Sequence, residues 1–230
     1  MCGRFTMAID ADDLQTELAL GQVPADWKPR YNVAPGQNIG VVTNPHSRDV
    51  TWMQWGLVPF WAKDPTIGNR LINARADSLD EKPSFKYAFA KRRCLIIADG
   101  FYEWQKPQAG AKSSRPFYYS LRKGKAFVFA GLWESWQPKD DPESKLITCT
   151  IITTVANALV AQVHDRMPVI LNDEDKWAWL QEDNPATLKA LLKPAPDDLL
   201  QAWEVSRAVN DPKNDSPVCI TPLQEGFGGA

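Results

Sequence analysis

The chain begins MCGRFTM, which places a cysteine directly after the initiator methionine. Because the Cys2 side chain is small, we expect the cell's methionine-removing machinery to take off Met1 and leave a free 1,2-aminothiol. Reference pKa values of about 7.7–8.0 for an α-amine and about 8.5 for a thiol leave both groups partly deprotonated near neutral pH. Two adjacent nucleophiles suit an electrophile that is attacked twice, such as an aldehyde. Taken alone, Cys2 fits equally well as an accidental cysteine at a frayed terminus.

Two further stretches carry polar residues with spacings suited to chemistry. In LINARADS, Asn73 and Arg75 stand two apart, so they project to the same side of an extended chain. In ADGFYEW, Glu103 stands between Tyr102 and Trp104. Desolvation by such neighbours raises a carboxyl pKa and makes the group a usable proton donor. The ordinary alternatives are that LINARADS is a polar loop and that Glu103 is a solvated glutamate on an alternating strand.

A third stretch, VHDRMPVIL, contains one of the two histidines of the chain. His164 is followed by Asp165 and Arg166, just before an apolar run typical of a strand. Histidine is the side chain whose unperturbed pKa lies near physiological pH, which suits proton transfer. A structural histidine is the competing interpretation.

The bulk composition describes an ordinary globular protein. The 230 residues are 44% hydrophobic and 23% charged, which is enough for one large domain with a substantial core. The chain start lacks the pattern of a secretory signal, and no stretch reaches the roughly 18–20 apolar residues that span a bilayer. We therefore expect a cytoplasmic, nucleoid-associated protein. The four cysteines are scattered and two histidines are few, so we expect no disulfide framework and no metal site.

The charge is distributed unevenly along the chain. The net charge is −2, which argues against indiscriminate binding of nucleic acid. Residues 1–130, however, have six more basic than acidic side chains, and residues 131–230 have eight more acidic than basic ones. This asymmetry permits a local positive groove for an anionic backbone.

The apolar runs predict the elements that must position these residues. Alternating, β-branched and aromatic runs predict mainly antiparallel strands, and capped segments predict peripheral helices. We therefore expect an α+β fold: a single domain built on a curved, barrel-like sheet, spanning residues 1–222, with a disordered tail at 223–230. The predicted strands are 4–9, 38–43, 49–55, 94–99, 116–121, 126–133 and 146–154, the predicted helices are 10–21, 83–91, 173–181 and 184–193, and 56–78 is predicted to be a long ordered loop.

Seven motifs together resemble one known family. They follow one another in the family's order from Cys2 to about Asn214, nearly the whole chain, and although each is weak alone, the series is highly specific. The combination is similar to the SOS response-associated peptidase family, the abasic-site processing proteins. The motifs are MCGRF, RYNVAPG, WGLVPFWA, LINARAD, ADGFYEW, HDRMPVIL and VSRAVNDPKN.

The resemblance implies a single α+β domain around a barrel-like antiparallel sheet, with a positive groove for single-stranded DNA. It also implies a covalent crosslink to abasic sites through Cys2, formed without a cofactor or metal, and associated peptidase and lyase chemistry. Single-stranded DNA containing abasic sites is the expected partner of a monomer, with replication or repair proteins as further candidates and no membrane.

The resemblance further implies the functional positions. Its reactive and active-site residues correspond to Cys2, Asn73, Glu103 and His164. Its DNA-contacting residues correspond to Arg4, Asn32, Pro35, Gly36, Trp61, Arg75, Trp104 and Arg166. One departure stands out, because Ala62 follows Trp61 where family members have consecutive tryptophans.

Two other functions remain open at this point. Glutamine amidohydrolases with an N-terminal nucleophile also begin Met-Cys-Gly, and they use the cysteine thiol with its own amine as the base. The motifs LINARAD, DGFYEW and HDRMP are not features of that class. The second alternative is a non-catalytic module that binds single strands or modified bases, with Cys2 only structural.

Overall fold

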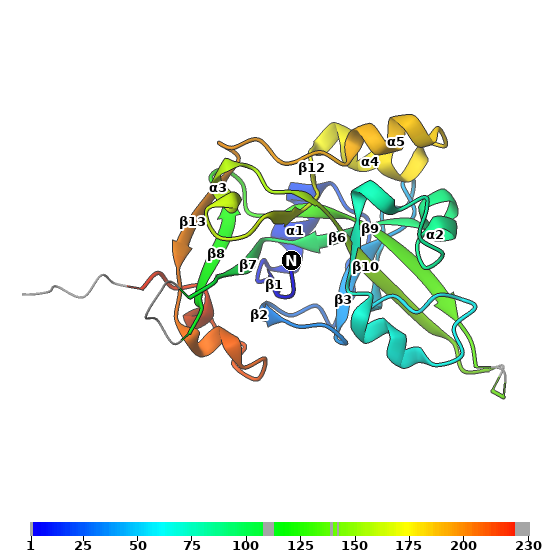
Figure 1. The fold of residues 1–230 in the computed structure, drawn as a ribbon, viewed down its shortest axis with the longest axis horizontal. Coiled ribbons are helices and arrows are strands. Elements are labelled where there is room, and N and C mark those ends of the chain that lie inside the picture. Colours follow the sequence, from blue (N-terminus) through cyan, green and yellow to red (C-terminus); the bar gives the residue numbers. More distant parts are fainter. Residues whose placement is uncertain (1, 108–112, 139, 142, 224–230) are drawn as a thin grey trace, which may run out of the picture.

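The computed structural model describes residues 2–107, 113–138, 140, 141 and 143–223. Within this part, one sheet has the strand order β13-β8-β7-β1-β2, and every neighbouring pair in it is antiparallel. The short N-terminal strand β1 therefore lies between β2 and β7 (Figure 1). The bounds are β1 Phe5–Met7, β2 Arg30–Val33, β7 Gly100–Gln105, β8 Arg115–Leu121 and β13 Leu200–Glu204.

The second sheet closes into a barrel. Strands β10, β4, β3, β6 and β9 pair in that order, and β9 pairs with β10 to complete the ring. Only the β10–β4 pair of this ring is parallel. Strands β11 and β12 extend the sheet, and β5 pairs with β10 in parallel. The bounds are β3 Asn38–Val42, β4 Val50–Trp55, β5 Asn73–Arg75, β6 Arg93–Ala98, β9 Phe127–Trp136, β10 Leu146–Val155, β11 Arg166–Pro168 and β12 Ile170–Leu171.

A shared aromatic core joins the two sheets. Phe5 of β1 packs edge-on against Trp55 of β4 and Phe129 of β9, with ring centroids 5.1 and 5.8 Å apart. Phe5 and Trp55 are completely buried. Contacts of this kind stabilise a pair beyond the area they bury, by about 0.5–1.5 kcal/mol. The core thus fixes β1 against the barrel.

The helices lie at the periphery. Asp10 caps the first helix, where its side chain accepts a hydrogen bond from the Asp13 amide. Trp179 of α4 is fully buried against the barrel and donates to the Cys94 carbonyl oxygen over 3.1 Å. The helices are α1 Ala11–Leu18, α2 Lys86–Lys91, α3 Ala158–Ala161, α4 Asp173–Gln181 and α5 Pro185–Leu191, and short 3-10 turns occur at Pro65–Arg70, Ala76–Ser78, Arg207–Asn210 and Pro217–Cys219.

The predicted α+β fold on a curved, barrel-like and mainly antiparallel sheet is confirmed. Several details differ from the sequence prediction, which did not include strands β2 and β13. Helix α1 ends in a left-handed residue, Ala19, rather than at Gly21, and α2 begins at Lys86 rather than at Pro83. The predicted loop 56–78 contains the strand β5, which has no local signature because it is three residues long and its partner β10 is distant in sequence. Apart from Leu223, the predicted tail 223–230 lies outside the described residues.

Among the described residues, every helix is too short or too polar to cross a bilayer. The same part of the chain contains no group of three or more His, Cys, Asp or Glu side chains arranged to hold a metal ion.

Candidate functional site

The N-terminal strand brings Cys2 to the point where three strands from distant parts of the sequence meet. The backbone ladder between β1 and β7 continues beyond β1, because the Tyr102 amide donates to the Arg4 carbonyl oxygen over 3.0 Å. From the barrel side, Asn73 of β5 donates through Nδ2 to the Cys2 carbonyl oxygen over 2.7 Å. Cys2 is fully buried. Its backbone is therefore fixed by both sheets.

Glu103 of β7 lies within electrostatic reach of this cysteine. Burial raises the pKa of the Cys2 thiol well above its ordinary value, and the negative charge of Glu103 raises it further. Glu103 itself is 2% exposed, and burial raises its pKa to about 7. At neutral pH both protonation states of this carboxyl are therefore populated, which suits a group that accepts and returns protons.

His164 lies in the loop between α3 and β11. The Gln105 side chain at the end of β7 donates to the Gln162 carbonyl oxygen over 3.2 Å, which ties this loop to the strand of Glu103. The Arg166 amide donates to His164 Nδ1 over 3.1 Å. Asp165 Oδ1 lies 3.0 Å from the same Nδ1 atom, and burial lowers the pKa of His164, which favours the neutral imidazole.

Parallel pairing places Asn73 and Arg75 on the same strand face. In β5 they pair with Ile151 and Thr153 of β10, respectively. As the spacing of two predicted, their side chains share one face of the strand. Asn73 is directed at the cysteine, whereas Arg75 lies at the exposed end.

Two arginines and an aspartate form a cluster beside the site. Arg75 holds Asp77 through two hydrogen bonds, of 3.1 Å from Nε and 2.6 Å from an Nη atom, and its side chain is 58% exposed. Arg166 is nearly buried; it donates to the Thr153 carbonyl oxygen over 2.5 Å and lies 3.8 Å from Asp77. Asp77 therefore partly neutralises the positive charges of both arginines.

Arg4 and Asn32 are occupied by contacts within the protein. One Nη of Arg4 donates to the Asn32 Oδ1 over 2.6 Å and to the Val209 carbonyl oxygen over 2.7 Å. Asn32 is fully buried, and its amide nitrogen donates to carbonyl oxygens of Val209, Asp211 and Asn214. These contacts attach residues 206–219, which we call the C-terminal strap, to β2. Contact of Asn32 with DNA stays a prediction.

The turn and the aromatic residues of the predicted set differ in exposure. Pro35 and Gly36 form the exposed turn between β2 and β3, and Gly36 has a positive φ of 84°, which suits the residue after proline in a type II turn. Trp61 is 48% exposed. Trp104 is partly buried, and its Nε1 donates to Asn210 of the strap over 2.8 Å. Trp61 is thus the more accessible of the two tryptophans.

Residues that the sequence analysis did not select also belong to this site. Asp77 and Thr153 hold the two arginines, and the strap residue Asn210 holds Trp104. Asp77 lies within a motif that was noted, so its proximity to Arg75 could have been found. No sequence pattern pointed to Thr153 or Asn210, because their hydrogen-bond partners are more than ten residues away in the sequence.

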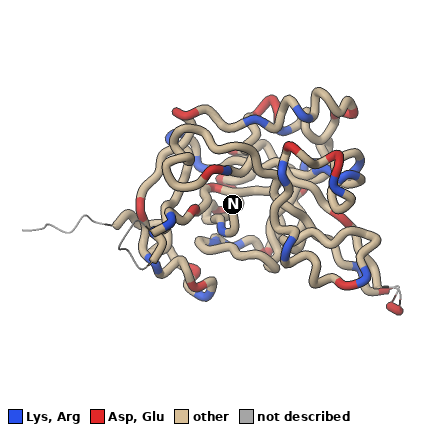
Figure 2. Tube along the Cα trace, in the orientation of Figure 1, with Lys and Arg blue, Asp and Glu red and all other residues tan. Residues whose placement is uncertain are grey.

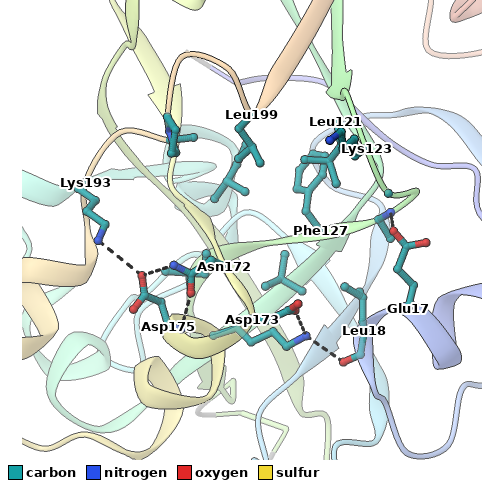
Figure 3. Close-up of a pocket in the computed structure, with 18 of the residues that line it drawn as sticks. Glu17, Leu18, Leu121, Lys123, Phe127, Asn172, Asp173, Asp175, Lys193 and Leu199 are labelled. Atoms are coloured by element: carbon teal, nitrogen blue, oxygen red, sulfur yellow. Dashed lines mark hydrogen bonds and ion pairs between the residues drawn. The ribbon is translucent and has the colours of Figure 1, made fainter.

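A separate cavity lies away from these residues. It has a volume of about 440 Å³ and is lined by the start of β9, by β12, by the N-terminus of α4 and by the segment before β13. Figure 3 shows apolar side chains such as Leu199 and Phe127 around it, and an ion pair between Lys193 and Asp175 beside it. None of the predicted site residues lines this cavity.

Along the chain trace, basic and acidic residues are interspersed (Figure 2).

Comparison with known proteins shows similarity along the whole chain. Residues 1–212 match the family described as SOS response associated peptidase (SRAP). The abasic site processing protein YoqW of Bacillus subtilis (strain 168) is 45% identical over 226 residues, which cover 96% of this chain and 99% of the relative. The abasic site processing protein HMCES of Pongo abelii is 30% identical over 272 residues, covering 97% of this chain and 76% of the relative.

Solved structures share the fold of this chain. A crystal structure of a protein from Bacteroides thetaiotaomicron superposes with a TM-score of 0.86 at 26% identity, covering 97% of this chain and all of the other. A protein from Bordetella bronchiseptica superposes with a TM-score of 0.75 at 24% identity, covering 89% of this chain. With a family match over residues 1–212 and a 45% identical relative aligned over 99% of its length, this chain belongs to the SOS response associated peptidase (SRAP) family.

Proposed function

We propose that this protein binds abasic sites in single-stranded DNA and forms a covalent crosslink to them through Cys2. The family and the relatives named abasic site processing proteins support a role in DNA damage and repair. The observation that carries the finer proposal is the meeting of Cys2, which precedes β1, with Asn73 of β5 and Glu103 of β7. A buried carboxyl whose charge acts on the Cys2 thiol supports a chemical role for Cys2 rather than a packing role alone.

The proposed chemistry requires removal of Met1. As long as Cys2 is preceded by a residue, its nitrogen is an amide and is not nucleophilic. Removal of Met1 yields an amine whose reference pKa of about 7.7–8.0 leaves a useful neutral fraction at physiological pH. Nucleophiles on the nitrogen and on the sulfur of one residue then face the same carbonyl carbon.

The substrate reacts in its open aldehyde form. Closed abasic deoxyribose is a hemiacetal; its opening breaks the bond from the anomeric carbon to the ring oxygen, and His164 relays the proton of the anomeric hydroxyl to that ring oxygen. The Cys2 amine adds to the aldehyde carbon and gives a carbinolamine. Glu103 takes the proton from the nitrogen and returns one to the leaving hydroxyl, which departs as water and leaves a Schiff base.

The sulfur then closes the ring. The Cys2 thiol adds to the imine carbon, its proton passes to the imine nitrogen, and a five-membered thiazolidine forms with no change in oxidation state. The Asn73 hydrogen bond to the Cys2 carbonyl oxygen holds the attacking residue in register during both additions. Ring closure profits from the high effective molarity of two groups on one residue.

DNA contacts fall mainly on phosphates, because an abasic site has no base edge to read. Arg75 is the exposed cation of the cluster, and Arg166 lies behind it. Trp61 provides an exposed ring on which a neighbouring base can stack. A lyase activity through the Schiff base and an associated autoproteolytic activity, which removal of Met1 alone does not require, belong to the same proposal, as do action as a monomer and a place on DNA in the cytoplasm.

The test is a crosslinking assay with a 20-mer single strand that carries one abasic site. A band that survives boiling in denaturing gel, together with mass spectrometry showing attachment at Cys2, supports the proposal. Binding without a covalent band would favour a non-catalytic single-strand module. Release of ammonia from glutamine without any DNA product would favour an N-terminal-nucleophile amidohydrolase.

A further inference from the structure

The buried carboxylate of Asp99 plays no part in the chemistry above, yet it accepts hydrogen bonds from the N-terminal strand. We propose that Asp99 is a positioning residue that locks β1 in register against β7 and so delivers Cys2 to Glu103. This inference rests on the proposed function for its consequence in catalysis. The hydrogen bonds of Asp99 to Thr6, Ala8 and Ile9, which we call the lock, can be tested without DNA.

The contacts of Asp99 all go to the end of β1 and the residues after it. One carboxylate oxygen accepts the backbone amides of Ala8 and Ile9, over 2.6 and 2.7 Å. The other oxygen accepts the hydroxyl hydrogen of Thr6 in a short hydrogen bond. The Asp99 amide in turn donates to the Thr6 carbonyl oxygen over 3.1 Å. Four hydrogen bonds therefore join Asp99, the residue before β7, to Thr6, Ala8 and Ile9 of the N-terminal segment.

A third strand takes part in this lock. The Tyr118 hydroxyl of β8 lies 3.0 Å from Thr6 Oγ1. Because the single Thr6 hydroxyl hydrogen goes to Asp99, Tyr118 is the donor in this second bond. The approach depends on Gly100, since a Cβ at that position would lie 2.1 Å from the Tyr118 hydroxyl oxygen. Tyr118, Thr6 and Asp99 thus form a hydrogen-bonded chain across β8, β1 and the start of β7.

The lock determines where Cys2 lies. Phe5 pairs with Phe101 and Thr6 pairs with Gly100, and the Arg4 carbonyl oxygen continues the ladder to Tyr102. Each step along a strand is about 3.3 Å, so a slip by one residue would displace Cys2 by about the length of a reacting distance. Strand β1 is only three residues long, and its own ladder holds the register weakly.

The buried surroundings of Asp99 disfavour its ionised form. Burial raises the pKa of Asp99 to about 6, while the bonds from Thr6, Ala8 and Ile9 oppose the rise. The other titratable groups that face it are Tyr118 and Tyr102, whose own pKa values its charge raises. A buried carboxylate that served packing alone could be replaced by an apolar side chain, whereas this one accepts hydrogen bonds from three donors: the Thr6 hydroxyl and the Ala8 and Ile9 amides.

The test compares Asp99→Asn, Thr6→Val and Thr6→Ser. Thr6→Val keeps the shape and loses the hydroxyl, whereas Thr6→Ser keeps the hydroxyl. Thr150→Val is the matched control, because Thr150 is an equally buried threonine on β10 that lies outside the lock. Mass spectrometry first confirms removal of Met1, and circular dichroism confirms folding at the assay temperature.

We expect Asp99→Asn and Thr6→Val to slow crosslinking at saturating DNA at least tenfold, with the Kd for DNA changed less than twofold. Thr6→Ser and Thr150→Val should react at the rate of the unmodified protein. A merely structural role would lower the Tm and leave the saturated rate of every folded variant unchanged, and that result would overturn the proposal.

Hydrogen exchange tests the lock without chemistry. The Tyr102 amide, which donates to Arg4, should exchange at least tenfold faster in Asp99→Asn and Thr6→Val and at an unchanged rate in Thr150→Val. An unchanged exchange rate of the Tyr102 amide in Asp99→Asn and Thr6→Val would contradict the proposal. If the unmodified protein forms no crosslink while exchange behaves as expected, the lock stands and the proposed function fails.

Discussion

The side-chain amide of Asn73 donates to the carbonyl oxygen of Cys2 over 2.7 Å and links the barrel to the N-terminal strand. Asn73 belongs to β5, which the parallel pairing with β10 holds in place. Cys2 is therefore attached to a strand residue 71 positions away in the sequence. Four predictions follow from the geometry around this bond.

Asn73→Ala removes the donor and leaves the Cys2 carbonyl oxygen without this partner. Loss of a hydrogen bond of this kind costs about 1 kcal/mol of stability. We expect crosslinking at saturating abasic DNA to slow about tenfold, because the N-terminus loses its fixed orientation. Single-turnover gel assays measure this rate, and Asn38→Ala, at the exposed start of β3, serves as the control. An unchanged rate would show that β5 does not orient Cys2.

Cys2→Ala keeps the α-amine and removes the sulfur. The Schiff base can still form, but ring closure cannot follow. We expect no heat-stable band, a covalent band after trapping with borohydride, and strand cleavage through β-elimination. A heat-stable adduct of Cys2→Ala without any reductant would be incompatible with a thiazolidine.

Glu103→Gln should stabilise the fold at alkaline pH and slow the reaction. The pKa of Glu103 is about 7 in the folded protein against an ordinary value of 4.5. Below about pH 4.5 both states are protonated, so the variant and the unmodified protein have similar stability. As pH rises toward 7, the unfolded state ionises first, and the unmodified protein loses up to about 3 kcal/mol relative to the variant.

The measurement is a series of thermal unfolding curves between pH 4 and pH 8.5. At pH 8 the Tm of Glu103→Gln should exceed that of the unmodified protein by roughly 6–12 °C, and the difference should vanish near pH 4. Crosslinking should fall by a factor of about 10²–10⁴ if this carboxyl transfers protons. A Tm difference that is independent of pH would contradict the buried, half-ionised carboxyl.

Arg75→Ala and Asp77→Asn should change DNA affinity in opposite directions. Arg75 is exposed and Asp77 partly neutralises it, so losing the arginine weakens binding to every sequence alike, whereas losing the acidic charge strengthens binding. The slope of log Kd against log salt should fall by about 0.7 for Arg75→Ala on a single strand. Fluorescence anisotropy at several salt concentrations measures both effects. Equal affinities of the two variants and the unmodified protein would exclude this pair from the DNA-binding surface.

The sequence by itself determined the class of fold and most of its strands. The β-branched and aromatic runs at 94–99, 126–133 and 146–154 lie in β6, β9 and β10, because such runs pack well in a sheet that is buried on both faces. The capping pattern at Asp10 likewise marked the start of α1. Cys94 and Cys149 are buried in strands, as their apolar surroundings indicated.

Only the tertiary structure decided which polar residues meet. A local pattern contains no information on a three-residue strand such as β5, whose position depends on pairing with β10 about 78 residues later. The burial that raises the pKa of Glu103 to about 7 comes from the packing of both sheets, and the strap contacts that occupy Asn32 and Trp104 come from residues near the other end of the chain. Spacing in the sequence fixes which side chains share one strand face, but long-range pairing fixes the distance from Asn73 to Cys2.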